Sequence, residues 1–401
     1  MPERVRLGYV PPMLDAVLLA TTIASGAATT IPSGPPGDAF YTPPSPLPAR
    51  TDGAVIWARR FTGGSALESA SANYRILYET VNANGEFVAV SGTLAIPSGV
   101  PPPQGWPAIS WAHGTVGDAP QCAPSRSSVP NGEQRMLDDF VRRGYAVAQT
   151  DYEGNGTPGI HPYFVATSAA RDVTDIVRAA RRIDPQIGSK WVVMGHSEGG
   201  TAALSTAALG RQWAPELDLV GAVAYAPASY LESILQNEIL SDSPNSGLPY
   251  LGLIVAGFAT IDPRIVPSQM LQPDALRMMP ELQQRCIDEL ETNSDWSLMI
   301  PREMFHQDAP GLDALYQDLV QNTPENFRIT LPTLLVQGVA DPMVTSESTI
   351  ALRDRLCRGG APVAFKAYLG ATHGSVLTAA AGDVAAWIAQ RFSGAPEHSD
   401  C

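Results

Sequence analysis

The pentapeptide Gly195-His196-Ser197-Glu198-Gly199 carries the clearest chemical potential in the chain. It fits the pattern Gly-x-Ser-x-Gly, in which a sharp turn from a strand into a helix exposes a serine hydroxyl as a nucleophile. An apolar strand is predicted at residues 190–194, and a proline-free helix-forming run follows at residues 201–209. We expect the two glycines to leave room for a neighbouring strand and helix, where a side chain would collide. The alternative is a structural turn with an inert serine, so the assignment depends on finding partners.

A nucleophilic serine needs a base, and the base needs an acid to orient it. Asp341 lies in residues 338–342, directly after the predicted strand at 329–337. His373 lies between two glycines in residues 370–374, directly after another predicted strand. The order serine, aspartate, histidine is typical of one class of hydrolase. We therefore predict Ser197, Asp341 and His373 as a catalytic triad, with an ordinary Asp-Pro turn as the alternative for Asp341.

Attack of a serine on a carbonyl creates an oxyanion that two preorganised N–H donors must stabilise. The first predicted donor is the backbone N–H of Glu198, directly after the nucleophile. The second is the backbone N–H of Thr115, in the loop His113-Gly114-Thr115 that follows a predicted strand at 106–112. His113 is expected to brace that loop. The other histidines, at 161, 196, 306 and 398, are expected to be packing or surface residues.

These side chains need a scaffold, and the pattern of apolar residues predicts an α/β fold. Strands at 74–81 and 86–96, joined by an Asn-Gly turn, predict an antiparallel start to the sheet. Alternating strands and helices then predict a mostly parallel sheet with helices on both faces. The further strands are expected at 106–112, 145–150, 219–225 and 363–369. Helices are expected at 133–143, 165–183 and 376–392, and another helix, after the strand at 329–337, is expected to end at residue 352.

The alternation breaks in a helical, proline-punctuated stretch, which predicts an inserted helical cap or lid at residues 229–324. Residues 28–228 and 325–401 are then the two parts of the α/β domain. A cap inserted there would cover the carboxyl ends of the strands, where such sheets bind ligands. The apolar run at 248–261 either lines an acyl channel or forms a buried packing helix.

Composition narrows the class of protein. Among 401 residues the net charge is −14, which argues against a nucleic-acid partner. No stretch is long and apolar enough to span a membrane. Arg4 and Arg6 precede an apolar run at 16–24 and then small residues, so residues 1–27 are predicted to be a signal peptide, with a loosely packed leader as the alternative.

The four cysteines are Cys122, Cys286, Cys357 and Cys401. In an exported protein an even count suggests two disulfides, and spacing leaves all three pairings open. None of the cysteines forms a zinc-type cluster, so no metal site is expected.

An ordered set of short motifs resembles the secretory lipase family of α/β-hydrolases, and the likeness extends from about residue 38 onward. The motifs are Phe40-Tyr41-Thr42-Pro43-Pro44, Cys122-Ala123-Pro124-Ser125, Asp151-Tyr152-Glu153-Gly154 and Glu397-His398-Ser399-Asp400-Cys401. The resemblance implies an α/β-hydrolase fold, export, and hydrolysis of triacylglycerols or shorter carboxylic esters. It also implies the disulfide pairings Cys122–Cys286 and Cys357–Cys401.

The sequence thus predicts a secreted serine ester hydrolase that works through an acyl-enzyme and needs no cofactor. Its partner would be an ester or lipid substrate, in solution or at a lipid–water interface; the oligomeric state is not predicted. One alternative is a serine hydrolase of amide, peptide or other acyl bonds. Another is a non-catalytic binding protein on the same fold, although such proteins usually lose a triad member.

Overall fold

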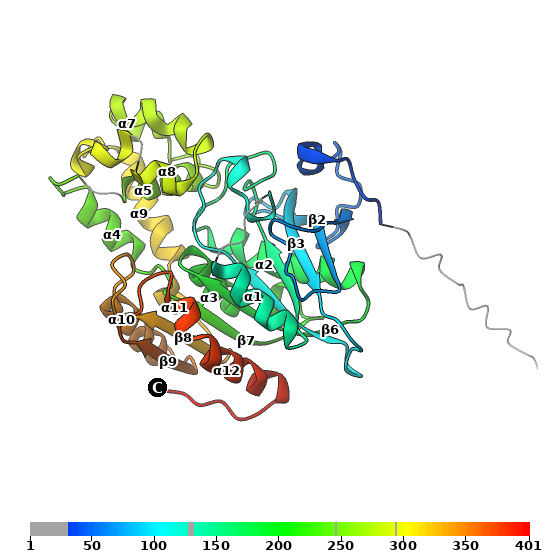
Figure 1. The fold of residues 1–401 in the computed structure, drawn as a ribbon. Coiled ribbons are helices and arrows are strands. Elements are labelled where there is room, and N and C mark those ends of the chain that lie inside the picture. The colour runs from blue at the N-terminus through cyan, green and yellow to red at the C-terminus, as the bar shows by residue number, and fades with distance from the viewer. Residues whose placement is uncertain (1–30, 127–131, 245–246, 293–294) are drawn as a thin grey trace, which may run out of the picture. The chain divides into compact units, whose positions relative to one another are not determined.

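A nine-stranded sheet runs through the computed structural model, in the order β1-β2-β3-β5-β4-β6-β7-β8-β9 (Figure 1). The structure describes residues 31–126, 132–244, 247–292 and 295–401. The strands are β1 (Val55–Arg60), β2 (Ala72–Val81), β3 (Phe87–Ile96), β4 (Trp106–Ala112), β5 (Ala146–Thr150), β6 (Ile187–His196), β7 (Asp218–Tyr225), β8 (Thr333–Gly338) and β9 (Val363–Tyr368).

The sheet begins antiparallel and continues parallel. Strands β1, β2 and β3 pair antiparallel in sequence, and β3 also pairs antiparallel with β5. From β5 through β4, β6, β7 and β8 to β9 every pairing is parallel. The predicted fold class is therefore confirmed. Strand β1 was not predicted, and it makes the antiparallel part three strands long.

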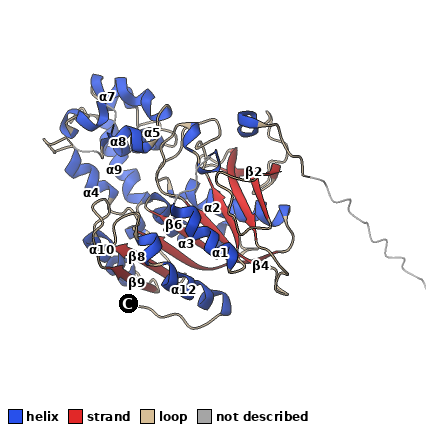
Figure 2. Ribbon diagram, viewed as in Figure 1, coloured by secondary structure: helices blue, strands red, loops and turns tan. Residues whose placement is uncertain are grey.

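Helices cover both faces of this sheet (Figure 2). The covering helices are α1 (Gly132–Arg142), α2 (Ala166–Ile183), α3 (Glu198–Trp213), α10 (Ser346–Arg358), α11 (Val376–Ala379) and α12 (Ala381–Ser393). Successive side chains of a strand point to opposite faces, which explains the two apolar layers. In β6, Trp191 and Val193 pack with α2, α3 and α10, whereas Val192 and Met194 pack with α1, α11 and α12.

Two predicted boundaries were inexact. The strand predicted at 329–337 begins only at Thr333, since Pro332 has no N–H for a strand ladder. The final helix is divided at Ala380 into α11 and α12.

The stretch between β7 and β8 is helical and has an apolar core of its own. Figure 1 shows its helices gathered as one group, green to yellow. They are α4 (Leu231–Glu238), α5 (Leu248–Phe258), α6 (Pro267–Met270), α7 (Pro273–Met278), α8 (Ile287–Thr292) and α9 (Pro310–Asn322). Buried Trp296 and Phe305 belong to this core, and Tyr163 and Phe164, from the loop before α2, join it. We call α4 to α9 the helical segment.

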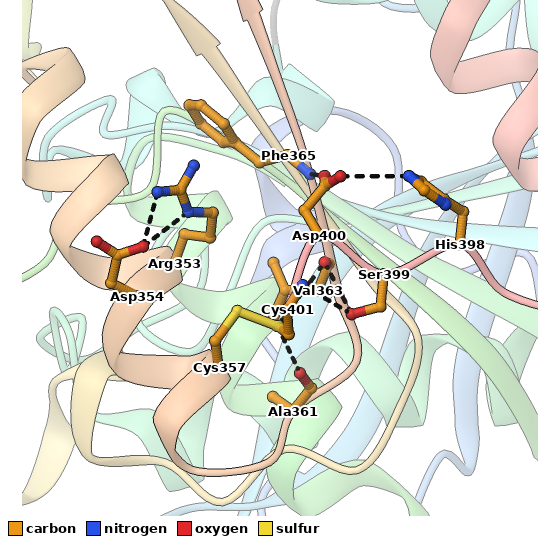
Figure 3. Close-up of a disulfide and its surroundings, with 10 residues drawn as sticks. All are labelled: Arg353, Asp354, Cys357, Ala361, Val363, Phe365, His398, Ser399, Asp400 and Cys401. Atoms are coloured by element: carbon orange, nitrogen blue, oxygen red, sulfur yellow. Dashed lines mark hydrogen bonds and ion pairs between the residues drawn. A yellow bond between two sulfur atoms is a disulfide. The ribbon is translucent and has the colours of Figure 1, made fainter.

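Residues 398–401 cover the free edge of β9 (Figure 3). Cys401 is joined to Cys357 of α10, which is one of the pairings that the resemblance implies. The N–H of Asp400 donates to the carbonyl of Val363 at 2.7 Å, and its carboxylate accepts the N–H of Phe365 at 2.6 Å. Because an unpaired edge strand invites pairing with other chains, this contact blunts the edge of the sheet.

The predicted signal peptide at 1–27 lies outside the described residues. Within the described ranges, no helix has the length and apolar character needed to cross a membrane.

Candidate active site

Ser197 occupies the sharp turn between β6 and α3. Its backbone has φ of 57° and ψ of −119°, a conformation that side-chain-bearing residues rarely adopt. Three backbone hydrogen bonds hold it there: its N–H donates to the carbonyl of Tyr225 at 2.9 Å, and its carbonyl accepts the N–H groups of Thr201 at 3.1 Å and Ala228 at 3.4 Å. The side chain is half-buried. A strained serine at a strand end, anchored through its backbone, is the geometry expected of a nucleophile elbow.

The two glycines of the pentapeptide allow this turn because they have no side chain and the neighbouring backbone lies very close to them. A Cβ on Gly195 would lie 1.9 Å from the carbonyl oxygen of Gly199, and a Cβ on Gly199 would lie 1.9 Å from that of Ala112. Neither contact is possible for real atoms, and the atoms in the way are backbone. The elbow therefore packs onto β4 so closely that only glycine fits at these positions.

Asp341 and His373 are in direct contact. Oδ2 of Asp341 lies 2.7 Å from Nδ1 of His373, and Oδ1 accepts the backbone N–H groups of Met343 and Val344 at 2.9 and 3.0 Å. Burial raises the pKa of Asp341, but the hydrogen bonds from the imidazole and the two N–H groups outweigh burial, so its pKa lies below the ordinary value. The carboxylate is thus ionised at neutral pH and can orient the ring and stabilise an imidazolium.

The two loops that carry this pair are bonded to each other through their backbones. The N–H of Ala340 donates to Ala371 at 2.9 Å, and that of Val339 donates to Tyr368 at 3.0 Å. Gly338 makes the close approach possible, since a Cβ there would lie 2.4 Å from the carbonyl oxygen of Ala371.

His196 connects the histidine loop to the elbow. Its Nε2 lies 2.9 Å from the carbonyl oxygen of His373, and the two rings are 4.4 Å apart. Burial and the neighbouring imidazole of His373 lower the pKa of His196 to about 3, so the ring is neutral and donates from Nε2. His196 therefore supports the loop that carries the candidate base, a more specific part than the packing residue expected from the sequence.

The structure brings Asp341 and His373 together and places the His373 loop against the residue that precedes Ser197. Among the described residues, the Ser197 hydroxyl forms no hydrogen bond. Serine–histidine contacts are often long until substrate binds.

The loop His113-Gly114-Thr115 lies against the elbow. A Cβ on Gly114 would come within 3.5 Å of Cβ of Ser197. Nδ1 of His113 lies 2.6 Å from the carbonyl oxygen of Gly114, so this ring braces its own loop. The hydroxyl of Tyr152 donates to the carbonyl of His113 at 3.0 Å and supports the same loop from outside.

A buried network joins three of the family-like motifs. The N–H of Ser125 donates to Oδ1 of Asp151 at 2.9 Å, and Ser91 donates to Oδ2 at 2.6 Å. The hydroxyls of Tyr41 and Ser125 are 3.0 Å apart. These motifs thus meet around one carboxylate, directly before Tyr152.

Sequence reasoning missed one ion pair next to the elbow. His161 was expected at the surface or in packing, but its Nε2 lies 2.7 Å from Oε1 of Glu198, and both side chains are buried. The second disulfide is close to this region: Cys122 is joined to Cys286 of the helical segment, as the resemblance implies.

A pocket of about 590 Å³ opens at Ser197, within the size range of small-molecule sites. Its lining combines apolar side chains of the helical segment and the loop before α2 with residues that follow Asp341. Residues of this lining include Tyr163, Phe164, Leu251, Ile254, Met343 and Val344. No cluster of metal-ligating side chains occurs in the described parts of the chain.

Strand order, elbow and acid–histidine pair define an α/β-hydrolase. Solved structures agree: Candida antarctica lipase A superposes with a TM-score of 0.74 over 90% of this chain and 87% of that chain, at 20% identity. An esterase that degrades rice cell walls, from Xanthomonas oryzae, gives 0.67 over 86% and 100%, also at 20% identity. The match to a family model identifies the protein more narrowly than the fold does. A secretory lipase model matches residues 125–400, so the chain belongs to the secretory lipase family.

Relatives in this family support ester hydrolysis. A secreted triacylglycerol lipase from Malassezia globosa is 24% identical over 95% of this chain and 86% of its own length. A probable inactive lipase from Mycobacterium tuberculosis is 26% identical over 90% and 83%. Because one relative is named a probable inactive lipase, membership of the family does not by itself establish activity in this chain.

Proposed function

We propose that the protein is a secreted carboxylic-ester hydrolase in which Ser197 is the nucleophile, His373 the general base and Asp341 the orienting acid. The observation that carries the proposal is the contact of 2.7 Å between Asp341 and His373 beside a strained serine elbow. His373 takes the serine proton as the hydroxyl attacks the ester carbonyl, and then returns it to the leaving alcohol. Water hydrolyses the acyl-enzyme in the same way.

The backbone N–H groups of Thr115 and Glu198 are the proposed oxyanion-hole donors. The approach of Gly114 to Ser197 supports the first, and the position of Glu198 as first residue of α3 supports the second. Both donors are backbone groups, so substitution of the Thr115 or Glu198 side chain would not remove them. Only a shift of the backbone at these residues would weaken their hydrogen bonds to the oxyanion.

The substrate is proposed to be an ester whose acyl chain enters the pocket beneath α5. Leu251 and Ile254 of this helix line the pocket as well as packing in the helical segment, so both interpretations of the apolar run 248–261 are compatible. Polar side chains such as Ser229 and Asn237 also line it, which favours short to medium acyl chains over long ones. We propose residues 229–324 as the cap that covers this pocket.

Two measurements test the proposal. A fluorophosphonate should label Ser197, identified by mass spectrometry of the digested protein, and no adduct would support the non-catalytic alternative. Rates on p-nitrophenyl esters of increasing chain length, with and without an emulsified interface, should peak at short to medium chains. If the rate instead peaks at long chains and requires an emulsified interface, the protein is a lipase and not an esterase for short to medium chains.

Export is part of the proposal. The family's secretory character and the two disulfides support it, since disulfides persist in oxidising compartments. N-terminal sequencing of exported protein should find a start after about residue 27. An unprocessed start at Met1 in that protein would contradict the predicted signal peptide.

A further inference from the structure

Two side chains of the loop between β5 and α2 contact the side chains of Glu198 and Thr115, the two residues whose backbone N–H groups are the proposed oxyanion-hole donors. Nε2 of His161 lies 2.7 Å from the carboxylate of Glu198, and the hydroxyl of Tyr163 lies 2.7 Å from Oγ1 of Thr115. His161 and Tyr163 are separated only by Pro162. One three-residue stretch therefore contacts the side chains of both residues whose backbone N–H groups are the proposed donors.

His161 is held as a cation by its partners. Nδ1 lies 3.0 Å from the carbonyl oxygen of Glu153, and Nε2 faces the carboxylate of Glu198. Both partners are acceptors, so both ring nitrogens must donate. Burial alone would lower the pKa of His161, but Glu198 and Asp118 raise it to about 9. The ring is also stacked on that of Tyr152, with centroids 5.2 Å apart, so it cannot swing away.

Tyr163 is as firmly placed as His161. It is fully buried, and its ring packs against Phe164 with centroids 4.2 Å apart. From the opposite side, helix α5 presses on the same stretch: a Cβ on Gly257 would lie 2.5 Å from the N atom of Tyr163 and 3.2 Å from the carbonyl oxygen of His161. The helical segment therefore backs this stretch directly.

We propose that His161-Pro162-Tyr163 is a positioning bridge that fixes the spacing of the two oxyanion-hole donors, with His161 acting through Glu198 and Tyr163 acting through Thr115. The inference rests on the proposed function and adds to it the residues that set the geometry of the donors. Tyr163 also lines the pocket at Ser197, but the role proposed for both side chains is positioning and not chemistry. They act through the donors, because a donor displaced by a fraction of an ångström no longer meets the oxyanion at bonding distance.

The test compares kcat and KM on a p-nitrophenyl ester for wild type, Tyr163→Phe, His161→Gln and the double variant. Tyr78→Phe is the matched control, because its buried hydroxyl also contacts a threonine hydroxyl, at 2.8 Å from Thr150, and lies outside the site. Each bridge variant should lower kcat about 10-fold, below the 10²–10³ for outright loss of a donor, with KM changed less than about twofold. Tyr78→Phe should lower only the thermal midpoint.

Because both bridge residues serve one oxyanion hole, the loss in the double variant should be smaller than the product of the single losses. A folded Tyr163→Phe variant with wild-type kcat would overturn the proposal, and so would losses that multiply. If His161→Gln does not fold, Tyr163→Phe against Tyr78→Phe decides alone. Wild type is measured first: if it hydrolyses no ester and takes no fluorophosphonate, the proposed function fails instead.

Discussion

The two halves of the candidate site are held by different kinds of contact. In the acid–histidine half, backbone hydrogen bonds join the two loops, and the side chains of His196 and Gln337 add support from outside them. Ala340 bonds to Ala371 through N–H and carbonyl, and the carboxylate of Asp341 receives the N–H groups of Met343 and Val344. Apart from Asp341 itself, side chains on either loop could change without breaking these bonds.

In the oxyanion half the holding contacts are buried side chains. The hydroxyls of Tyr152 and Tyr163 support the loop at His113 and Thr115, and the ring of His161 supports the first turn of α3. Each support ends in a single polar atom. The acid–histidine half should therefore be most sensitive to a new Cβ that prevents the close approach of its loops, whereas the oxyanion half should be sensitive to the loss of one hydroxyl or one charge.

The largest expected effect belongs to the nucleophile, on which both halves depend. Ser197→Ala should lower kcat by about 10⁴-fold or more, since residues that act as a unit lose nearly all catalysis when one is removed. The thermal midpoint and circular dichroism should stay close to wild type, because the strained turn is held by its backbone. Ester turnover by purified Ser197→Ala protein at wild-type rates would show that both halves surround the wrong residue.

The same contrast explains how much of the site the sequence could predict. The elbow glycines and the loops of Asp341 and His373 are local patterns that directly follow strands, so sequence alone placed them. The pair His161–Glu198 joins residues 37 positions apart, and a lone histidine before proline carries no local signal. The nearby Asp151-Tyr152-Glu153-Gly154 motif was the available hint, and it pointed to a family rather than to a contact.

The fold was predictable for a similar reason. Buried parallel strands such as β6 are apolar runs between helices, and the alternation was read directly. Strand β1 was missed because Val55–Arg60 is a half-exposed edge strand that ends in two arginines. Edge strands pair on one side only, so their sequences need not look like a core.

The second largest effect should come from the backbone of the acid–histidine half. Gly338→Ala should lower kcat about 10- to 100-fold, because its Cβ would push the Asp341 loop away from Ala371 and misplacement by about 1 Å can cost 10²-fold. Gly382→Ala is the matched control, since a Cβ there meets nothing within 4 Å. Equal kcat for the two variants would contradict the view that close backbone approach holds this half.

Removal of the two disulfides should affect activity differently. Cys122–Cys286 ties the chain after Thr115 to the helical segment, where the N–H of Ile287 also donates to the carbonyl of Val116 at 2.9 Å. Replacing both cysteines by serine should lower kcat several-fold, up to about 10-fold, as the oxyanion loop loosens.

Cys357–Cys401 is the control for that pair, because it lies at the start of β9, the end of the strand opposite the His373 loop. Its replacement by serine should leave kcat within about twofold while the free energy of unfolding falls by about 2–4 kcal/mol. Similar losses of kcat in both double variants would mean that the disulfides act through global stability, and that the oxyanion half has no special dependence on its link to the helical segment.

The smallest effect is a pH dependence of stability that belongs to the side-chain-held half. The pKa of His161 rises from 6.5 to about 9 on folding, because the attraction of Glu198 and Asp118 outweighs burial. A raised folded pKa stabilises the fold fully below pH 6.5, and this contribution is lost as pH rises through about 9. Burial raises the pKa of Asp118 to about 7, so its own contribution to stability is lost as pH rises to about 7 and overlaps the lower end of that window.

The thermal midpoint of wild type should therefore fall more between about pH 7 and 9 than that of His161→Gln. The difference between the two curves reports the imidazole together with its coupling to Asp118. Asp341 cannot produce this difference, because its lowered pKa moves its own transition to acid pH. Parallel curves would mean that His161 is not held as a cation. The oxyanion half would then lack its charged support and would rest on the hydroxyls of Tyr152 and Tyr163 alone.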